Sequence, residues 1–170
     1  MDAEQLERLR RQSQLAVTKE GDWTWGGNRV ENPRVQELFH SGVAVREDGE
    51  TIVAVGRMWA YFDAPVTAFF VRALAADGRT LRLYGGRELA LGPGVEAGWG
   101  PDERLYLWLP GLGGPAIALR DAHLALTSRL LERDGALWLE GAAGDPAIPV
   151  AMLGQIPTAA APGPGPHREG

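Results

Sequence analysis

The spacing of hydrophobic positions changes along the chain and predicts where helices and strands lie. Leu6 and Leu9 lie among charged residues at loosely helical spacing, which predicts a short amphipathic helix near the N-terminus. A second helix is predicted over about residues 33–41, because Asn32 can cap its start and Gly42 can end it.

From about residue 43 to residue 109, β-branched and aromatic runs are separated by Asp-Gly and Gly-Gly pairs. This pattern is typical of antiparallel hairpins. Asp48-Gly49 and Asp77-Gly78 are each predicted to turn one hairpin. The segments that they open, DGETIVAVGR and DGRTLRLYGGR, share one frame, which indicates an internal repeat.

A third helix is predicted from apolar residues that fall on two neighbouring rows of helical spacing, namely Ile117, Leu124 and Leu131, and Leu119, Leu126 and Leu130. We expect it to end near Arg133. A turn at Asp134-Gly135 is then predicted to lead into a strand, and a last short strand is predicted over residues 147–153. From Pro157 onward the chain is rich in proline, glycine and alanine, so a disordered tail is expected.

The segment GDWTWGG, residues 21–27, places two tryptophans two positions apart. In a strand, Trp23 and Trp25 would therefore lie on one face. The segment DGALWLEG, residues 134–141, keeps a similar frame with leucines in the tryptophan positions. Because leucine preserves packing but not stacking on a ligand, we expect both indoles to belong to the core.

The composition excludes several classes of function. The chain has 170 residues and 45% hydrophobic content, enough to bury one ordinary core or two small ones. Its formal net charge of −5 disfavours nucleic acid as a partner. The absence of cysteine excludes thiol chemistry and favours a cytoplasmic location. The N-terminus has no apolar signal segment and no run has the length of a membrane span, so no membrane partner is expected.

The most suggestive local motif is G-x-G-x-x-A, Gly111 to Ala116, between a predicted strand and the predicted third helix. Such a loop can bring backbone amides against a phosphate group. Against this, Pro115 has no amide hydrogen, and too little chain follows to complete a doubly wound sheet. A simple turn from a strand into a helix is the favoured interpretation.

Histidines and carboxylates do not indicate a reaction. His40, His123 and His167 have no metal-ligand spacing between them, so we expect no metal site. His123 lies at the edge of the predicted apolar face, where a half-buried packing role is favoured over that of a general base. The acidic residues of the predicted loops are expected to be solvated. We predict no catalytic residue and no cofactor.

Three segments together resemble a known family. They are EGDWTWGGNRVENPRVQELF, FDAP and LRDAHLALTSRLLERDGALWLEG, residues 20–39, 62–65 and 119–141. With the hairpin between them, they are similar to the bacterial family catalogued as domain of unknown function 1285. The residues that carry the likeness are Gly21, Trp23, Leu38, Phe39, Asp63, Ala64, Pro65, Arg120, Ala125 and Arg129. The chain departs from the family pattern at Val55 to Trp59, VGRMW, where the family usually has Thr-Pro-x-Glu.

The resemblance implies an α+β fold of two small β-rich lobes that arise from a duplicated core. Each lobe has a helix, and the second is loosely similar to a pleckstrin-homology-like barrel. We accordingly expect an N-terminal helical segment over residues 1–18, a first lobe over 19–74, a second lobe over 75–154 and a tail over 155–170. The family has no established reaction, and the resemblance implies a nucleotide-like ligand site between the lobes and a role in signalling.

The function that we expect is non-catalytic binding of a small anionic ligand at the lobe interface. Arg120 and Arg129, carried over from the resemblance, are the expected anion contacts. On one helix, with ~100° of rotation per residue, they would point to opposite sides, so Arg120 is preferred. Arg57, Arg72 and Asp63 would complete the pocket.

Two alternatives come from other classes of protein. One is a protein–protein interaction module in which Trp59, Trp99 and Trp108 form an exposed patch. The other is a hydrolase that uses Asp63 or His123 as its base.

Overall fold

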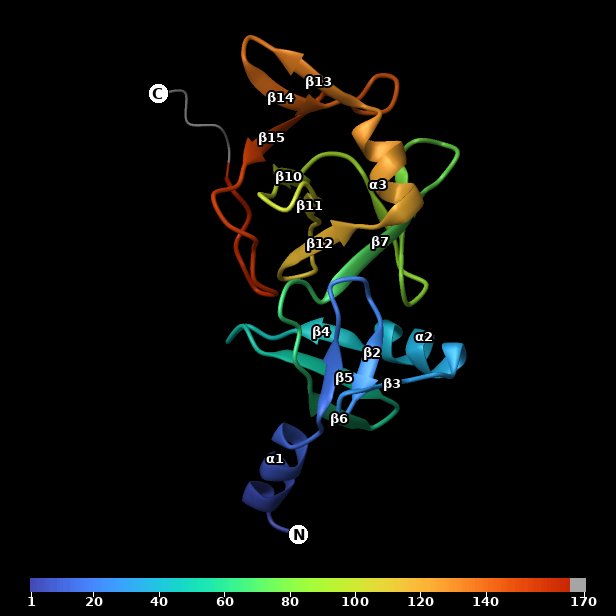
Figure 1. The fold of residues 1–170 in the computed structure, drawn as a ribbon, viewed down its shortest axis with the longest axis vertical. Coiled ribbons are helices and arrows are strands. Elements are labelled where there is room, and N and C mark those ends of the chain that lie inside the picture. Colours follow the sequence, from blue (N-terminus) through green and yellow to red (C-terminus); the bar gives the residue numbers. More distant parts are fainter. Residues whose placement is uncertain (166–170) are drawn as a thin grey trace.

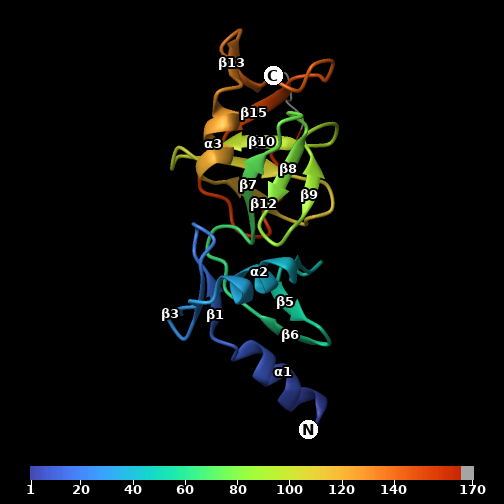
Figure 2. The same cartoon turned by 90° about the vertical axis from the view of Figure 1, so that its right-hand side faces the viewer.

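Two lobes follow one another along the long axis of the molecule (Figures 1 and 2). The computed structural model describes residues 1–165. The last five residues of the predicted tail, among them His167, lie outside this part. The fold is mixed α+β and mostly β, as the sequence predicted, with three helices among the described residues.

The N-terminal lobe has two three-stranded antiparallel sheets, β1-β2-β3 and β4-β5-β6, and α2 lies between them along the chain. Its elements are α1 (Ala3–Arg11), β1 (Leu15–Val17), β2 (Trp23–Trp25), β3 (Asn28–Arg29), α2 (Pro33–Ser41), β4 (Val43–Val45), β5 (Thr51–Val55) and β6 (Met58–Tyr61). Asp63, two residues after the end of β6, forms a parallel bridge with Ala16 of β1. This bridge joins the two sheets.

The C-terminal lobe is one nine-stranded sheet in the order β13-β14-β15-β10-β11-β12-β7-β8-β9. Its elements are β7 (Phe69–Leu74), β8 (Thr80–Leu83), β9 (Glu88–Ala90), β10 (Glu96–Trp99), β11 (Leu105–Trp108), β12 (Pro115–Ala118), α3 (Arg120–Thr127), β13 (Leu130–Arg133), β14 (Ala136–Leu139) and β15 (Ile148–Met152). The pairs β10–β15 and β7–β12 are parallel, and the others are antiparallel. Because β7 pairs with β12, residues 69–74 belong to the nine-stranded sheet.

Helix α2 begins and ends where its sequence predicts. The Asn32 side chain accepts a hydrogen bond from the Arg34 amide at 2.9 Å, which satisfies one of the free amides of the first turn. The helix ends before Gly42. A Cβ at Gly42 would press into the carbonyl group of Ala54, so only glycine fits this approach of helix to strand.

The predicted Asp-Gly turns are confirmed. Gly49 and Gly78, with φ of 85° and 70°, close the β4–β5 and β7–β8 hairpins, and Gly135 with φ of 78° closes β13–β14. Positive φ at these positions is the reason that glycine is needed there. The predicted strand over residues 147–153 is β15.

The third helix is shorter than predicted. It covers only residues 120–127, whereas Ile117 lies in β12 and Leu130 and Leu131 lie in β13. The Thr127 and Ser128 hydroxyls donate to helix carbonyls of the preceding turn, which is a competition with the backbone that favours a helix end. Apolar strand residues on either side of the helix continued the helical spacing by coincidence.

The G-x-G-x-x-A segment does not lead from a strand into a helix. It connects the antiparallel strands β11 and β12, and α3 begins only after β12. Gly111 and Gly113, with φ of 87° and 79°, supply the backbone turn. A dinucleotide-binding unit of the Rossmann type is therefore absent here. The segment is a turn, but the prediction that it leads into a helix was wrong, because Pro115 begins strand β12.

The two tryptophans of the GDWTWGG segment have different surroundings. Trp23 is fully buried and contacts the rings of Phe39 and Phe62, as predicted. Trp25 is 65% exposed, so the prediction that it packs in the core was wrong. It lies at the end of β2 beside the turn at Gly26, past the part of the sheet that α2 covers.

Helix α1 is attached to the N-terminal lobe through charged and aromatic side chains and buries none of its own residues. The guanidinium group of Arg10 lies 3.9 Å from the centre of the Trp59 ring, and that of Arg11 lies 4.2 Å from the Tyr61 ring. The Tyr61 hydroxyl donates to Glu7 at 2.9 Å. The helix projects from the end of the molecule opposite the C-terminal lobe (Figures 1 and 2).

The chain after β15 lies against the protein rather than extending as a free tail. Ala159 is buried, and the Trp108 indole donates to the carbonyl oxygen of Ala161 at 2.9 Å. Alanine and glycine are small enough to follow the surface closely, which composition alone does not reveal. Residues 157–165 form no helix or strand.

Candidate functional site at the start of helix α3

The parallel pairing of β7 with β12 brings the backbones of two of the predicted arginines close together. Val71 is paired with Ala118, and the Leu119 amide donates to the Val71 carbonyl oxygen at 3.0 Å. Arg72 follows Val71 on β7, and Arg120 follows Leu119 at the first position of α3. Both are exposed. Within residues 1–165, neither side chain forms a hydrogen bond or an ion pair.

The first turn of α3 is left without a side-chain cap. Its N-cap residue is Leu119, which offers no acceptor, and the first helical bonds come from the amides of Ala122 and His123 to the Leu119 carbonyl oxygen. The amides of Arg120 and Asp121 therefore face outward at the positive end of the helix dipole.

Arg120 adopts a left-handed backbone conformation, with φ of 47°. For a residue other than glycine, asparagine or aspartate this conformation is unusual and costs roughly 1 kcal/mol or more. The strained residue turns the chain from the end of β12 directly into the helix, and it carries the exposed guanidinium group.

Further along α3, His123 packs against the β10–β11 hairpin. Its ring stacks on Trp99 with the ring centres 5.9 Å apart. Burial lowers the pKa of His123, and the nearby positive charge of Arg104 lowers it further. Among the described residues the buried Nδ1 atom has no hydrogen-bond partner. Neutral imidazole is therefore the favoured form next to this arginine.

Arg129, the second of the expected anion contacts, is held by another part of the C-terminal lobe. It lies between α3 and β13 rather than on a helix with Arg120, and its guanidinium group donates to the Gly78 carbonyl oxygen at 3.0 Å. This bond ties the end of α3 to the β7–β8 turn, so Arg129 is committed to a contact within the lobe.

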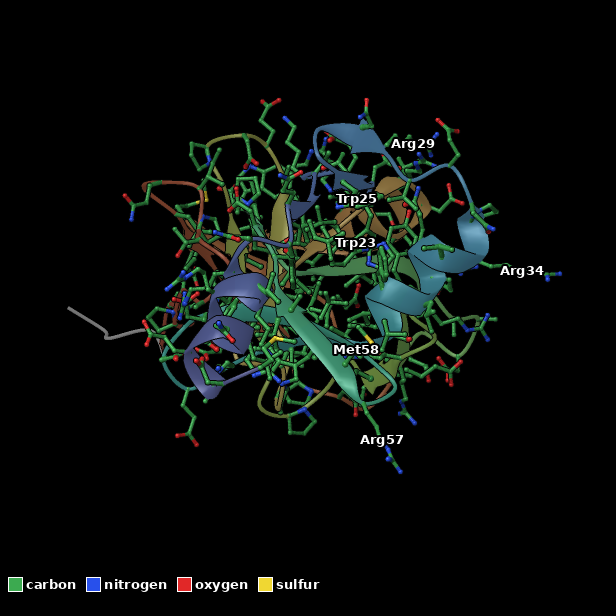
Figure 3. All side chains as sticks on the ribbon, turned by 90° about the horizontal axis from the view of Figure 1, so that it is seen from below. Trp23, Trp25, Arg29, Arg34, Arg57 and Met58 are labelled. Atoms are coloured by element: carbon green, nitrogen blue, oxygen red, sulfur yellow. The ribbon has the colours of Figure 1, made fainter. Side chains whose placement is uncertain are left out.

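Arg57 and Asp63 lie in the other lobe. Arg57 is in the exposed turn between β5 and β6 and points away from the protein (Figure 3). The backbone of Asp63 bonds to Leu15 and Val17 of β1, and its side chain is exposed beside a shallow hollow of about 370 Å³. The predicted set of five residues is thus divided among separate places.

The interface between the lobes is filled by other residues. His40, at the end of α2, is buried and its Nε2 donates to the carbonyl oxygen of Gly21 at 2.8 Å. Its ring contacts the rings of Phe70 and Tyr84 in the C-terminal lobe. Arg87 donates across the interface to the carbonyl oxygen of Val43. The hydrogen bonds and ring contacts that join the lobes within residues 1–165 involve none of the four predicted arginines.

The predicted patch of three tryptophans does not form. Trp59 lies under Arg10 of α1, Trp99 is stacked on His123, and Trp108 is 8% exposed and bonded to Ala161. Each indole is therefore engaged in a separate contact.

In the described part of the chain, no group of three or more histidine, cysteine or acidic side chains is arranged to hold a metal ion. No helix there is long and apolar enough to cross a membrane.

Sequence reasoning found Arg72 and Arg120 separately but not their proximity. Their pairing depends on the parallel register of β7 and β12, which are far apart in the sequence. The missing cap was visible as an apolar residue directly before Arg120, but the helix was predicted to start earlier, so the signal was not recognised.

Comparison with known proteins rests on structure. The sequence matches no family model and no curated protein. The structure is similar to the crystal structure of a DUF1285 family protein from Silicibacter pomeroyi DSS-3, with a TM-score of 0.62 and 19% identity over 81% of this chain and 79% of that one. A DUF1285 family protein from Shewanella baltica OS155 matches with a TM-score of 0.46 and 16% identity, over 64% of this chain and 85% of that one. The resemblance drawn from the sequence is thus confirmed in three dimensions, and the chain has the fold of a DUF1285 family protein.

Proposed function

We propose that the protein is a non-catalytic module that binds a small anionic, nucleotide-like ligand at the start of α3. The observation that carries this proposal is that two exposed arginines, Arg72 and Arg120, have neighbouring backbones at a helix start without a cap, and that neither side chain has a partner within residues 1–165. Guanidinium groups form paired hydrogen bonds with phosphate or carboxylate oxygens, and outward-facing amides at a helix start add donors.

This position differs from the predicted one between the lobes. The lobe interface is occupied by His40, Tyr84 and Arg87, whereas the start of α3 is open to solvent. Asp121, in the first turn, is the nearest negative side chain along the sequence and would oppose an anion close to it.

The hydrolase alternative has weaker support. Asp63 follows β6 of the N-terminal lobe, and His123 lies on α3 of the C-terminal lobe, so either candidate base would have to act without the other. A role in signalling, in which ligand binding is passed to a partner, remains part of the proposal.

The arrangement of strands supports a duplicated core. In the N-terminal lobe, α2 separates two three-stranded meanders, and the chain returns parallel to its first strand at Ala16 and Asp63. In the C-terminal lobe, α3 separates β10-β11-β12 from β13-β14-β15, and β15 returns parallel to β10. The likeness of this lobe to a pleckstrin-homology-like barrel stays a prediction.

The test is a thermal-shift screen of the protein with nucleotides. A ligand at ~100 times its dissociation constant stabilises the folded state by ~2.7 kcal/mol, which corresponds to a rise of roughly 5–11 °C for a chain of this length. Arg72→Ala and Arg120→Ala should each reduce the shift, and Arg57→Ala is the matched control because it removes an exposed arginine of the other lobe. An undiminished shift in the Arg72→Ala/Arg120→Ala double variant would refute the site, and no shift with any nucleotide would refute the ligand class.

A further inference from the structure

The segment of residues 158–165, which we name the C-terminal strap, crosses the side of the C-terminal lobe opposite α3 (Figure 1). The chain leaves β15 toward the N-terminal lobe, turns where the Ala161 amide donates to the Thr158 carbonyl oxygen at 3.0 Å, and returns along the sheet. The strap reads TAAAPGPG.

Three contacts seat the strap. Ala159 is buried, with its carbonyl group against Gly114, where any side chain would collide with it. The Trp108 indole donates to the carbonyl oxygen of Ala161 at 2.9 Å. The Glu96 carboxylate accepts a hydrogen bond from the Gly165 amide at 2.7 Å.

The strap does not fill the space beneath it. A groove of about 1120 Å³ lies between the strap and the sheet. It is lined by residues 94–97, Pro149 and Ala151 of the lobe, which include the Glu96 carboxylate, and by residues 162–165 of the strap. Alanine, proline and glycine side chains are too small to occupy it. The strap is therefore held at a few points and leaves apolar surface uncovered.

These contacts have the chemistry of proline-rich peptide recognition. Pro162 and Pro164 have a fixed φ and no amide hydrogen, so such a segment stays extended and offers carbonyl acceptors with little loss of entropy. Grooves that bind these segments use aromatic side chains with hydrogen-bond donors. Trp108 supplies such a donor beside the groove, in an adjoining hollow of about 400 Å³ that Ala161 and Pro162 also line.

We propose that the groove under the C-terminal strap is a docking site for an extended proline-rich segment of a partner protein, and that the strap is its tethered competitor. Tethering gives the strap a high effective concentration. A strap from a second copy of this chain would gain no contact that the tethered strap lacks. A partner segment with larger apolar side chains gains contacts in the free groove. These contacts offset the advantage in effective concentration that the tethered strap has. This proposal is independent of the site at α3.

The test uses full-length protein in which the strap is displaced. Ala159→Glu places a charge in the buried position, and Leu124→Glu, on an exposed face of α3, is the control for the added charge. The probe is a dye-labelled synthetic peptide with the strap sequence TAAAPGPG. We expect saturable binding to Ala159→Glu, and binding at least tenfold weaker to Leu124→Glu and to the unchanged chain.

Specificity is tested with the peptide TAAAAGAG, which lacks both prolines, and with Trp108→Phe added to Ala159→Glu. Each change should weaken binding at least fivefold. A folded Ala159→Glu variant that binds neither peptide, or both equally, would overturn the proposal.

If Ala159→Glu does not fold, Trp108→Phe in the unchanged strap provides a second measurement. It keeps an aromatic ring but removes the indole donor, so hydrogen exchange at Ala161 and Gly165 should accelerate at least tenfold. Unchanged exchange would contradict a displaceable strap. Dimerisation of the unchanged chain that is lost in either variant would also overturn the proposal, because a second copy would then be the occupant.

Discussion

Along the chain, helices α2 and α3 each lie between two three-stranded meanders, yet they start in opposite ways. Asn32 caps α2 with a side-chain hydrogen bond, whereas Leu119 gives α3 no cap and Arg120 enters the helix in a left-handed conformation. The start of α2 is thus stabilised by its cap, whereas the start of α3 carries backbone strain at one exposed arginine and lies near the backbone of another, Arg72.

The largest expected effect is on the free energy of unfolding, and it comes from the residue that anchors α3 in the core. Leu126 of α3 is fully buried, so Leu126→Ala should destabilise the protein by about 3 kcal/mol through lost burial and the cavity left behind. Leu124→Ala, 70% exposed on the same helix, should cost less than about 0.5 kcal/mol. Equal denaturant midpoints for the two variants would show that α3 is not held by its buried face.

Helix α2 is anchored instead by a titratable residue, His40. Burial lowers the pKa of His40 below the ordinary 6.5, although the Gly21 carbonyl group and the charges of Glu37 and Asp22 oppose this. The unfolded chain therefore binds a proton more readily. Stability should be full above pH 6.5 and fall as the pH drops below it, by at most about 1.4 kcal/mol per pH unit for one proton. His40→Asn should flatten this slope in denaturant titrations at pH 7 and pH 5. An unchanged slope would assign the acid sensitivity elsewhere.

The cap of α2 gives the next smaller effect. Asn32→Ala should lower the free energy of unfolding by about 1 kcal/mol, because the Arg34 amide loses its acceptor. Asn32→Gly should cost only a few tenths. If the alanine variant is as stable as the unchanged protein in urea, the difference between the two helix starts has no energetic basis.

Arg120→Gly should have the smallest effect on stability, and with the opposite sign. Glycine adopts positive φ without strain, so this variant should gain up to about 1 kcal/mol, whereas Arg120→Ala keeps the strained backbone and should not gain. Both should respond less to the anionic ligand. A glycine variant that is more stable and still responds fully would separate the strain from the binding site.

Much of the N-terminal lobe could be predicted from its sequence because its signals are local. Asn32, Gly42 and the Asp48-Gly49 turn act within a few residues of where they stand, and each acts as expected. Leu130 and Leu131 were assigned to the helix because strand and helix residues shared one spacing, and the turn at Thr127 and Ser128 depends on hydroxyl groups that the apolar pattern ignores.

The candidate site could be predicted only as separate residues. Arg72 and Arg120 become neighbours through the register of Val71 with Ala118, a pairing that no local pattern encodes. Trp25 was expected in the core because alternation places it on the same face of the strand as Trp23. Alternation does not show how far the core extends along that face, and Trp25 is exposed.

Helix α1 is stabilised from within by its own capping box, with Asp2 and Gln5 bonded reciprocally, and it buries no side chain. Since its contacts with the lobe are arginine–aromatic and ionic, high salt should weaken them without disturbing the core. The helix can then detach as a unit, and a protease would reach the connection at residues 12–14 while both lobes remain folded. The first cleavage of the native protein in high salt is therefore set by this local opening rather than by global unfolding.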